Sequence, residues 1–211
     1  LSIRKQTTFD AFLSRRAFFN ERRYIMYQLF TSESVTSGHP DKIADRISDS
    51  VLDAVLSLDK DSRVAIETCV SGNTVYVFGE MTTKAVVDLE AVVRASIKES
   101  GYDNPDYGFY YKTVEYHQHV SKQSPDIAMG VDETDGKEQG AGDQGLMFGF
   151  AKDDTKELMP LPVALAHGLA KRLETVRKEN IIKGLRPDGK AQVTVAYDKN
   201  QVPQFVTAVV I

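Results

Sequence analysis

Apolar residues recur every three or four positions in three segments, and this period predicts helices. The clearest pattern lies in 40–58, where the apolar positions are spaced four apart: Ile43, Ile47, Val51 and Val55. Segments over 84–100 and 159–180 show a similar period. The third segment has its expected buried side at Leu165, Leu169, Leu173 and Val176. Each helix should therefore bury one apolar face.

Runs rich in β-branched and aromatic residues predict six strands, at 28–35, 63–70, 74–80, 109–120, 191–197 and 205–211. Ser71-Gly72-Asn73 lies between the second and third of them and is typical of a hairpin turn. Glu67 and Glu80 interrupt these two strands, and each acid either points to solvent or needs a cation or donor inside. Cys69, the single cysteine, excludes an internal disulfide and is interpreted as a small core residue rather than a reactive thiol.

Composition and charge narrow the class of protein. With 42% hydrophobic and 27% charged residues over 211 positions, the chain is globular in composition, and no apolar run approaches the length of a membrane span. The net charge of −4 argues against a general nucleic-acid binder. Residues 1–28 carry +4 and the remainder −8, so a phosphate site would need bound cations or clustered basic groups.

The basic leader, residues 1–28, is interpreted as translated upstream sequence or a disordered arm, and Met26 is a plausible start. An organellar transit peptide is the alternative, which Asp10 and Glu21 weaken. The single cysteine fits a reducing compartment, and the predicted location is cytoplasmic.

The highest density of chemistry lies where the first predicted helix starts, in Ser37-Gly38-His39-Pro40-Asp41-Lys42. Pro40 suits the first helical position, so backbone N–H groups that attract phosphate should open beside His39 and Asp41. Asp41 can hold Mg²⁺ that bridges phosphate oxygens, Lys42 adds a positive charge, and His39 can donate or accept a proton. From this stretch alone, a capped helix with ordinary acidic residues in its first turn is an equal alternative.

Two further polar patterns raise the question of metal binding. One is a row of acidic residues four apart in the first predicted helix: Asp41, Asp45, Asp49 and Asp53. This row predicts either a solvated acidic face or a metal at its upper end. The other is the pair His117 and His119 on one strand face; no third ligand is evident, and a solvent-facing strand is the better interpretation.

A polar segment at 123–140, rich in Asp, Glu and Gly, has the length of a functional lid or a disordered loop. It leads into Gly140-Ala141-Gly142-Asp143-Gln144-Gly145, which matches the dinucleotide-binding pattern G-x-G-x-x-G. That motif needs a strand before it and a helix after it, whereas a polar stretch precedes it here and the strand-like run 146–151 follows. The glycines instead allow a ligand close to the backbone, where Asp143 and Gln144 could bind an ammonium group; a glycine turn entering a strand is the alternative.

Four motifs together resemble the S-adenosylmethionine synthetase family, also called methionine adenosyltransferases. In chain order they are Gly38 to Asp45, Gln123-Ser124-Pro125-Asp126-Ile127, Gly140 to Gly145, and Arg186-Pro187-Asp188-Gly189-Lys190. The resemblance covers residues 29–211. Each motif alone is weak, and their occurrence in the family's order is what makes the set specific.

The resemblance implies an α/β protein of the α+β type, with pseudo-symmetric repeated domains in which a mixed or antiparallel sheet is covered by helices on one face. It divides the chain into the leader, an N-terminal domain (29–122), a mobile loop (123–140) and part of a central domain (141–211). Family members pair through flat sheets into a homodimer or a dimer of dimers, with active sites between subunits. The implied reaction belongs to one-carbon metabolism: methionine sulfur attacks the ribose C5′ of ATP, and phosphate and pyrophosphate are released.

The resemblance also implies roles for individual residues. The implied catalytic and ATP-binding residues are His39, Lys190 and Asp188, the metal ligands are Asp41 for Mg²⁺ and Glu67 for K⁺, and the methionine-binding residues are Glu80, Gln123 and Asp143. A thioether is already nucleophilic and needs no base. Catalysis should therefore rest on in-line positioning and on neutralising a multiply charged leaving group.

One departure from the family bears on activity. Family members continue past the equivalent of Ile211 into a glycine-rich phosphate loop and further charged site residues, so the sequence is expected to be truncated. The competing hypothesis is therefore a non-catalytic module that pairs with a partner subunit, and a Mg²⁺-dependent phosphate hydrolase is a third. The leader and Tyr116-His117-Gln118-His119 also depart from the family pattern.

Overall fold

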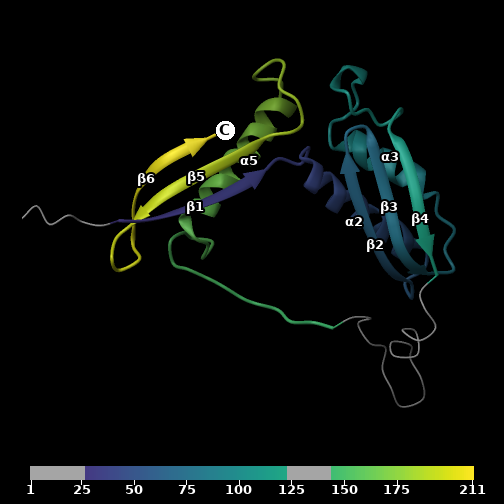
Figure 1. Ribbon diagram of the computed structural model, residues 1–211, viewed down its shortest axis with the longest axis horizontal. Helices are drawn as coiled ribbons and strands as arrows, with labels where there is room; N and C mark the ends of the chain where they lie inside the picture. Colours follow the sequence, from purple (N-terminus) through teal and green to yellow (C-terminus); the bar gives the residue numbers. More distant parts are fainter. Residues whose placement is uncertain (1–26, 123–143) are drawn as a thin grey trace, which may run out of the picture.

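The structure, a computed structural model, describes residues 27–122 and 144–211. These residues form two three-stranded sheets, one with two helices against one face and the other with a single helix, and the two lobes lie side by side (Figure 1). The predicted fold class, α+β with mixed or antiparallel sheets covered on one face, is confirmed. Met26, Gln123 and Asp143 lie outside the described residues.

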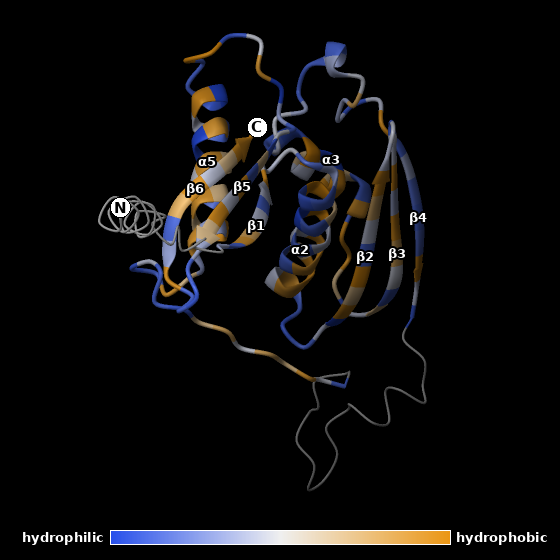
Figure 2. Cartoon of the chain, turned by 60° about the vertical axis from the view of Figure 1, so that its left-hand side comes forward, coloured by the Kyte–Doolittle hydropathy of each residue, from blue (hydrophilic) through white to orange (hydrophobic). Residues whose placement is uncertain are grey.

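The first lobe is a mixed sheet in the order β2-β3-β4. Strands β2 (Arg63–Ser71) and β3 (Thr74–Thr82) form the predicted antiparallel hairpin, and Gly72 turns it with a φ of 57°. Strand β4 (Glu115–Ser121) runs parallel to β3. Hydrophobic and hydrophilic positions alternate along these strands, so one face is apolar (Figure 2).

Two helices cover that apolar face, α2 (Pro40–Leu58) and α3 (Leu89–Glu99). The apolar row of α2 lies in the core as predicted, with each member at most 1% exposed: Ile43, Ile47, Val51 and Val55. The acidic row on its other side is exposed along its whole length, as expected for a solvated face.

The second lobe is an antiparallel sheet in the order β1-β5-β6. It contains β1 (Gln28–Val35), β5 (Lys190–Tyr197) and β6 (Pro203–Val210), and α5 (Leu161–Lys178) packs on β1 and β5. Strand β1 precedes α2 in the chain but pairs with β5, from Gln28 opposite Tyr197 to Val35 opposite Lys190. The range predicted for the N-terminal domain thus begins with a strand of the second sheet, and the domain boundaries stay a prediction.

Two elements begin later in the structure than predicted, because local polar contacts form a cap or a turn ahead of them. Helix α3 starts at Leu89 instead of position 84, since the Asp88 carboxylate accepts a hydrogen bond from the Ala91 N–H at 3.0 Å and caps the helix there. Strand β4 starts at Glu115 instead of position 109. The backbone N–H groups of Thr113 and Val114 both bond the carbonyl of Tyr110, which closes a turn ahead of the strand.

Three other predictions are wrong in whole or in part. The run 146–151 forms no strand: no strand of the described residues pairs with it, and its side chains are exposed. In α5, Val176 is buried and Leu169 packs on the core as predicted, but the fully buried positions nearer its start are Ala166 and Ala170, and Leu165 is exposed. Cys69 is exposed rather than in the core, because odd-numbered positions of β2 face away from the helices.

Candidate active site

The start of α2 has the predicted geometry. His39 is the N-cap and Pro40 the first helical residue. The Nδ1 atom of His39 accepts a hydrogen bond from the Asp41 N–H at 3.2 Å, which leaves Nε2 as the donor of the neutral ring. The Asp41 side chain is 89% exposed, so its carboxylate is open to a ligand. The helix start thus combines a ring N–H donor, a carboxylate and the positive end of a helix.

The structure brings the first and last of the four motifs together, although about 150 residues separate them. The buried Thr36 hydroxyl donates to the carbonyl of Pro187 at 2.7 Å, and the Thr36 N–H donates to the carbonyl of Gly189 at 2.9 Å. Gly38 lies against Pro187 itself. His39 and Asp41 therefore share one junction between the lobes with the 186–190 segment.

Glycine is required at position 38 because a Cβ there would lie 2.4 Å from three atoms of Pro187. Gly38→Ala is expected to destabilise the fold by about 1–3 kcal/mol, the typical cost of overpacking, and to displace His39 from the 186–190 segment. Gly168→Ala is the control, since a Cβ at that helical position meets nothing within 4 Å and should stabilise α5 by about 1 kcal/mol. Thermal unfolding of both variants checks the prediction; equal melting temperatures would contradict it.

Lys190 lies at the start of β5 and pairs with Glu33 of β1. The Lys190 Nζ is 2.5 Å from one Glu33 oxygen, and the Gln192 side chain donates to the other oxygen at 2.8 Å. These two hydrogen bonds, that of Lys190 first, hold the pKa of Glu33 below its usual value. Lys190 is half exposed, so its ammonium is held in place and still open to solvent.

A cavity of about 350 Å³ adjoins the start of α2 at the junction. Pro40 and Ile43 line it from α2, and Arg186 and Asp188 line it from the second lobe. The Arg186 guanidinium lies 5.4 Å from the ring centre of Tyr107, a cation–π contact between the lobes. The volume lies in the range of small-molecule sites, and Asp188 is the one predicted site residue of the described part that lines it.

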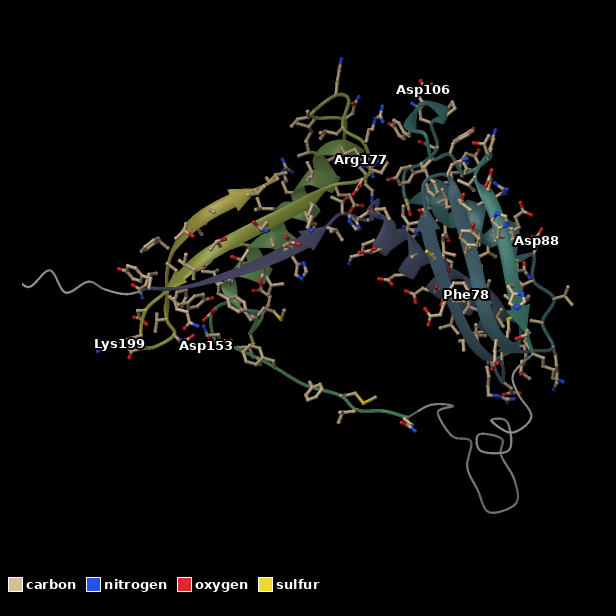
Figure 3. The ribbon with its side chains drawn as sticks, in the orientation of Figure 1. Phe78, Asp88, Asp106, Asp153, Arg177 and Lys199 are labelled. Atoms are coloured by element: carbon tan, nitrogen blue, oxygen red, sulfur yellow. The ribbon has the colours of Figure 1, made fainter. Side chains whose placement is uncertain are left out.

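Glu67 and Glu80 lie elsewhere, on the side of the first sheet that the helices leave open. Glu80 pairs with Ala65, and Glu67 pairs with Phe78, which marks this side of β3 in Figure 3. We define the outer face by its members: Ala65, Glu67, Cys69, Tyr76, Phe78, Glu80, His117 and His119. His117 stacks on Tyr76 at 4.8 Å between ring centres, and both histidines are exposed as predicted. The acids of the outer face and the residues at the junction are therefore on opposite sides of the sheet.

The donor set at the junction fits a metal that is shared with a ligand. Among residues 27–122 and 144–211, no group of three or more His, Cys, Asp or Glu side chains could hold a metal ion by itself. Asp41 and Asp188 offer exposed carboxylate oxygens. Mg²⁺ is commonly bound by one or two carboxylates together with substrate phosphates, so this set suits Mg²⁺ that arrives with phosphate.

Sequence reasoning missed five residues that lie at or beside the junction: Glu33, Thr36, Tyr102, Glu174 and Arg177. The Glu174 carboxylate accepts from the Ser37 N–H, and Arg177, at the end of α5 that faces the other lobe, lies against Gly101 (Figure 3). All of these contacts join segments far apart in the chain, so no local period or spacing could have revealed them. No helix of the described part is both long and apolar enough to cross a membrane.

The two helix-backed sheets, with a polar site where they meet, define a two-lobed α+β protein. Residues 27–125 match the family model of the S-adenosylmethionine synthetase N-terminal domain, and residues 138–211 match that of its central domain. The chain belongs to the S-adenosylmethionine synthetase family.

Curated relatives carry the same family name. The S-adenosylmethionine synthase of Acholeplasma laidlawii is 54% identical over 189 residues, which cover 88% of this chain and 49% of the relative. That of Desulfosudis oleivorans is 55% identical over 184 residues, covering 86% and 47% respectively. The chain therefore spans about half the length of the curated relatives it matches.

Proposed function

We propose that the protein containing this chain forms S-adenosylmethionine from ATP and L-methionine. The observation that carries the proposal is the direct contact between the segment 36–38 and the segment 187–189. This contact joins the two segments that carry a histidine, two carboxylates and a lysine, at a helix N-terminus. Such a set can position a triphosphate and neutralise it as it leaves.

The roles follow from the chemistry of each side chain. His39, through Nε2–H, and Lys190, through its ammonium, would donate to the triphosphate oxygens that gain charge when the C5′–O bond breaks. Asp188 would hold ATP from the other wall of the junction, and Asp41 would hold Mg²⁺. Mg²⁺ would supply charge neutralisation of the phosphates when bound.

The outer face would supply the second half of each site in a dimer. Glu80 and Gln123 would contact methionine, Asp143 would meet its ammonium group, and Glu67 would be associated with K⁺. Tyr76 and Phe78 of the same face are 45% and 43% exposed, which suits a face covered by a second subunit. Glu67 and Glu80 face away from α2, so we propose that they serve a site completed by the other subunit.

Product analysis of the complete gene product tests this function. With ATP, methionine and Mg²⁺, we expect S-adenosylmethionine, phosphate and pyrophosphate in equal amounts, and no product when methionine or Mg²⁺ is left out. ATP turnover that is independent of methionine would overturn the proposal in favour of a Mg²⁺-dependent phosphate hydrolase.

The exposed outer face also favours a second candidate for the 211-residue chain by itself, a module that pairs with a partner subunit without catalysis. Sedimentation and activity of the purified chain separate the two. Self-association without activity supports the module, and S-adenosylmethionine formation by the chain alone refutes it.

A further inference from the structure

Tyr102 connects the first lobe to the segment that precedes α2. Gly101, with a φ of 103°, turns the chain after α3. The hydroxyl of Tyr102 then donates a hydrogen bond to the carbonyl of Gly38 at 2.6 Å. The ring is buried, with 9% of the residue exposed, and the edge-to-face neighbours are Phe109 at 5.0 Å and Tyr107 at 6.4 Å between ring centres. Packing therefore fixes the ring, and the ring fixes where its hydroxyl lies.

The Gly38 carbonyl is the point at which both lobes hold the chain just before His39. Pro187 blocks movement of Gly38 on one side, because even a Cβ has no room there. Thr36, two residues earlier, is bonded to Pro187 and Gly189. Tyr102 supplies the contact from the first lobe, so the peptide that leads into His39 is held by both lobes.

The Tyr102 hydroxyl stays a donor at all physiological pH values. Burial, and second the nearby Asp188 carboxylate, raise the pKa of Tyr102 to about 12. A deprotonated oxygen would repel the Gly38 carbonyl, and that state is not reached near neutrality. The hydrogen bond is therefore a permanent support and not a switch.

We propose that Tyr102 is a positioning residue for the reaction proposed above: by holding the Gly38 carbonyl it sets the place of His39 and Asp41 relative to Asp188 and Lys190. The inference rests on the proposed function. Tyr102 acts through the backbone: its hydroxyl is bonded to the Gly38 carbonyl, while its ring lines the cavity with Asp188 and is retained in phenylalanine. Loss of the Tyr102 hydroxyl should therefore lower the rate of the chemical step. The binding of methionine, which is assigned to other residues, should stay unchanged.

The test compares Tyr102→Phe with Tyr197→Phe in the complete gene product. Each variant keeps a buried ring and loses one hydroxyl hydrogen bond, since the Tyr197 hydroxyl donates to Asp154 at 2.8 Å in the second sheet. We expect kcat of Tyr102→Phe to fall about ten- to a hundredfold with an unchanged KM for methionine, because small displacements of reacting groups are costly. Tyr197→Phe should lose a similar or greater amount of thermal stability and keep the wild-type kcat.

A second readout does not depend on turnover. The Ile43 N–H closes the first hydrogen bond of α2, to the His39 carbonyl at 2.9 Å, so its hydrogen exchange reports opening of the helix start. Exchange at Ile43 should be several-fold faster in Tyr102→Phe and unchanged in Tyr197→Phe. If Tyr102→Phe does not fold, Thr36→Val loosens the same segment from its other side. The same fall in kcat and the same faster exchange at Ile43 are expected of Thr36→Val.

The outcomes separate this inference from the proposed function. Wild-type protein that forms no S-adenosylmethionine would overturn the proposed function and the role of Tyr102 with it. Active wild-type protein, with equal kcat and equal Ile43 exchange in both tyrosine variants, would overturn only the role of Tyr102.

Discussion

Lys190→Met in the complete gene product should lower kcat for S-adenosylmethionine formation by about 10²–10³-fold, the usual cost of removing one donor that stabilises developing charge. Methionine retains the length and apolar stem of lysine and removes only the ammonium. The pair between Lys190 and Glu33 is exposed, and exposed ion pairs contribute little to stability. The melting temperature should therefore change little, and the rate loss should reflect the missing charge.

Lys152→Met is the control for the Lys190 variant. Lys152 is also a lysine paired with a carboxylate, that of Asp154 at 3.1 Å, but Asp154 bonds Tyr197 at the end of β5 opposite Lys190. Its replacement should leave kcat within about twofold of wild type, because substitutions away from a site have small effects on it. A Lys190→Met enzyme as fast as this control would remove Lys190 from the active site.

Local sequence signals predicted the elements whose causes are local. The bounds of α2 are those predicted, because a proline, a capping residue and a period-four apolar row all agree there. In α5 the period was correct and Val176 is buried as predicted, but the buried positions before it are one residue later than predicted. Its small residues, Ala166 and Ala170, lie in the core while the larger Leu165 is exposed, so side-chain size misled the assignment of the buried face.

Features that depend on distant partners could not be predicted. The run 146–151 has the composition of a strand, but a strand also needs a neighbour to satisfy its backbone, and none lies beside it in the described residues. The pairing of β1 with β5 and the bond from Tyr102 to Gly38 join segments 64 or more residues apart. Periodicity contains no information about such pairs.

The candidate site likewise has one part that local sequence signals predicted and another that depends on distant partners. The residue types at 37–42 predicted a helix that starts at Pro40, and the structure has that start with His39 as its N-cap. Anion binding at this helix start stays a prediction. The roles of Glu67, Glu80 and Lys190 came from the family resemblance and stay predictions. What the structure adds is their arrangement: Lys190 shares the junction with the start of α2, and both glutamates lie on the outer face.

That arrangement leads to a prediction about subunits. If one site combines the junction of one subunit with the outer face of another, then variants damaged in different halves can repair each other. Glu80→Ala removes a group of the outer face, and Lys190→Met removes one of the junction. Each homodimer should be inactive, since both of its sites lack the same group.

Subunit exchange between these two inactive enzymes should restore activity. After equal amounts of Glu80→Ala and Lys190→Met are mixed, we expect about a quarter of wild-type activity, because random exchange makes half of the dimers mixed and each mixed dimer regains one intact site. A mixture of Asp41→Asn with Lys190→Met is the control and should stay inactive, as both changes damage the junction half. Recovery is measured as S-adenosylmethionine formed before and after exchange. If the mixture of Glu80→Ala with Lys190→Met stays inactive although exchange is complete by mass measurement, Glu80 and Lys190 do not belong to sites shared between subunits, and the assignment of the outer face to the partner's site is wrong.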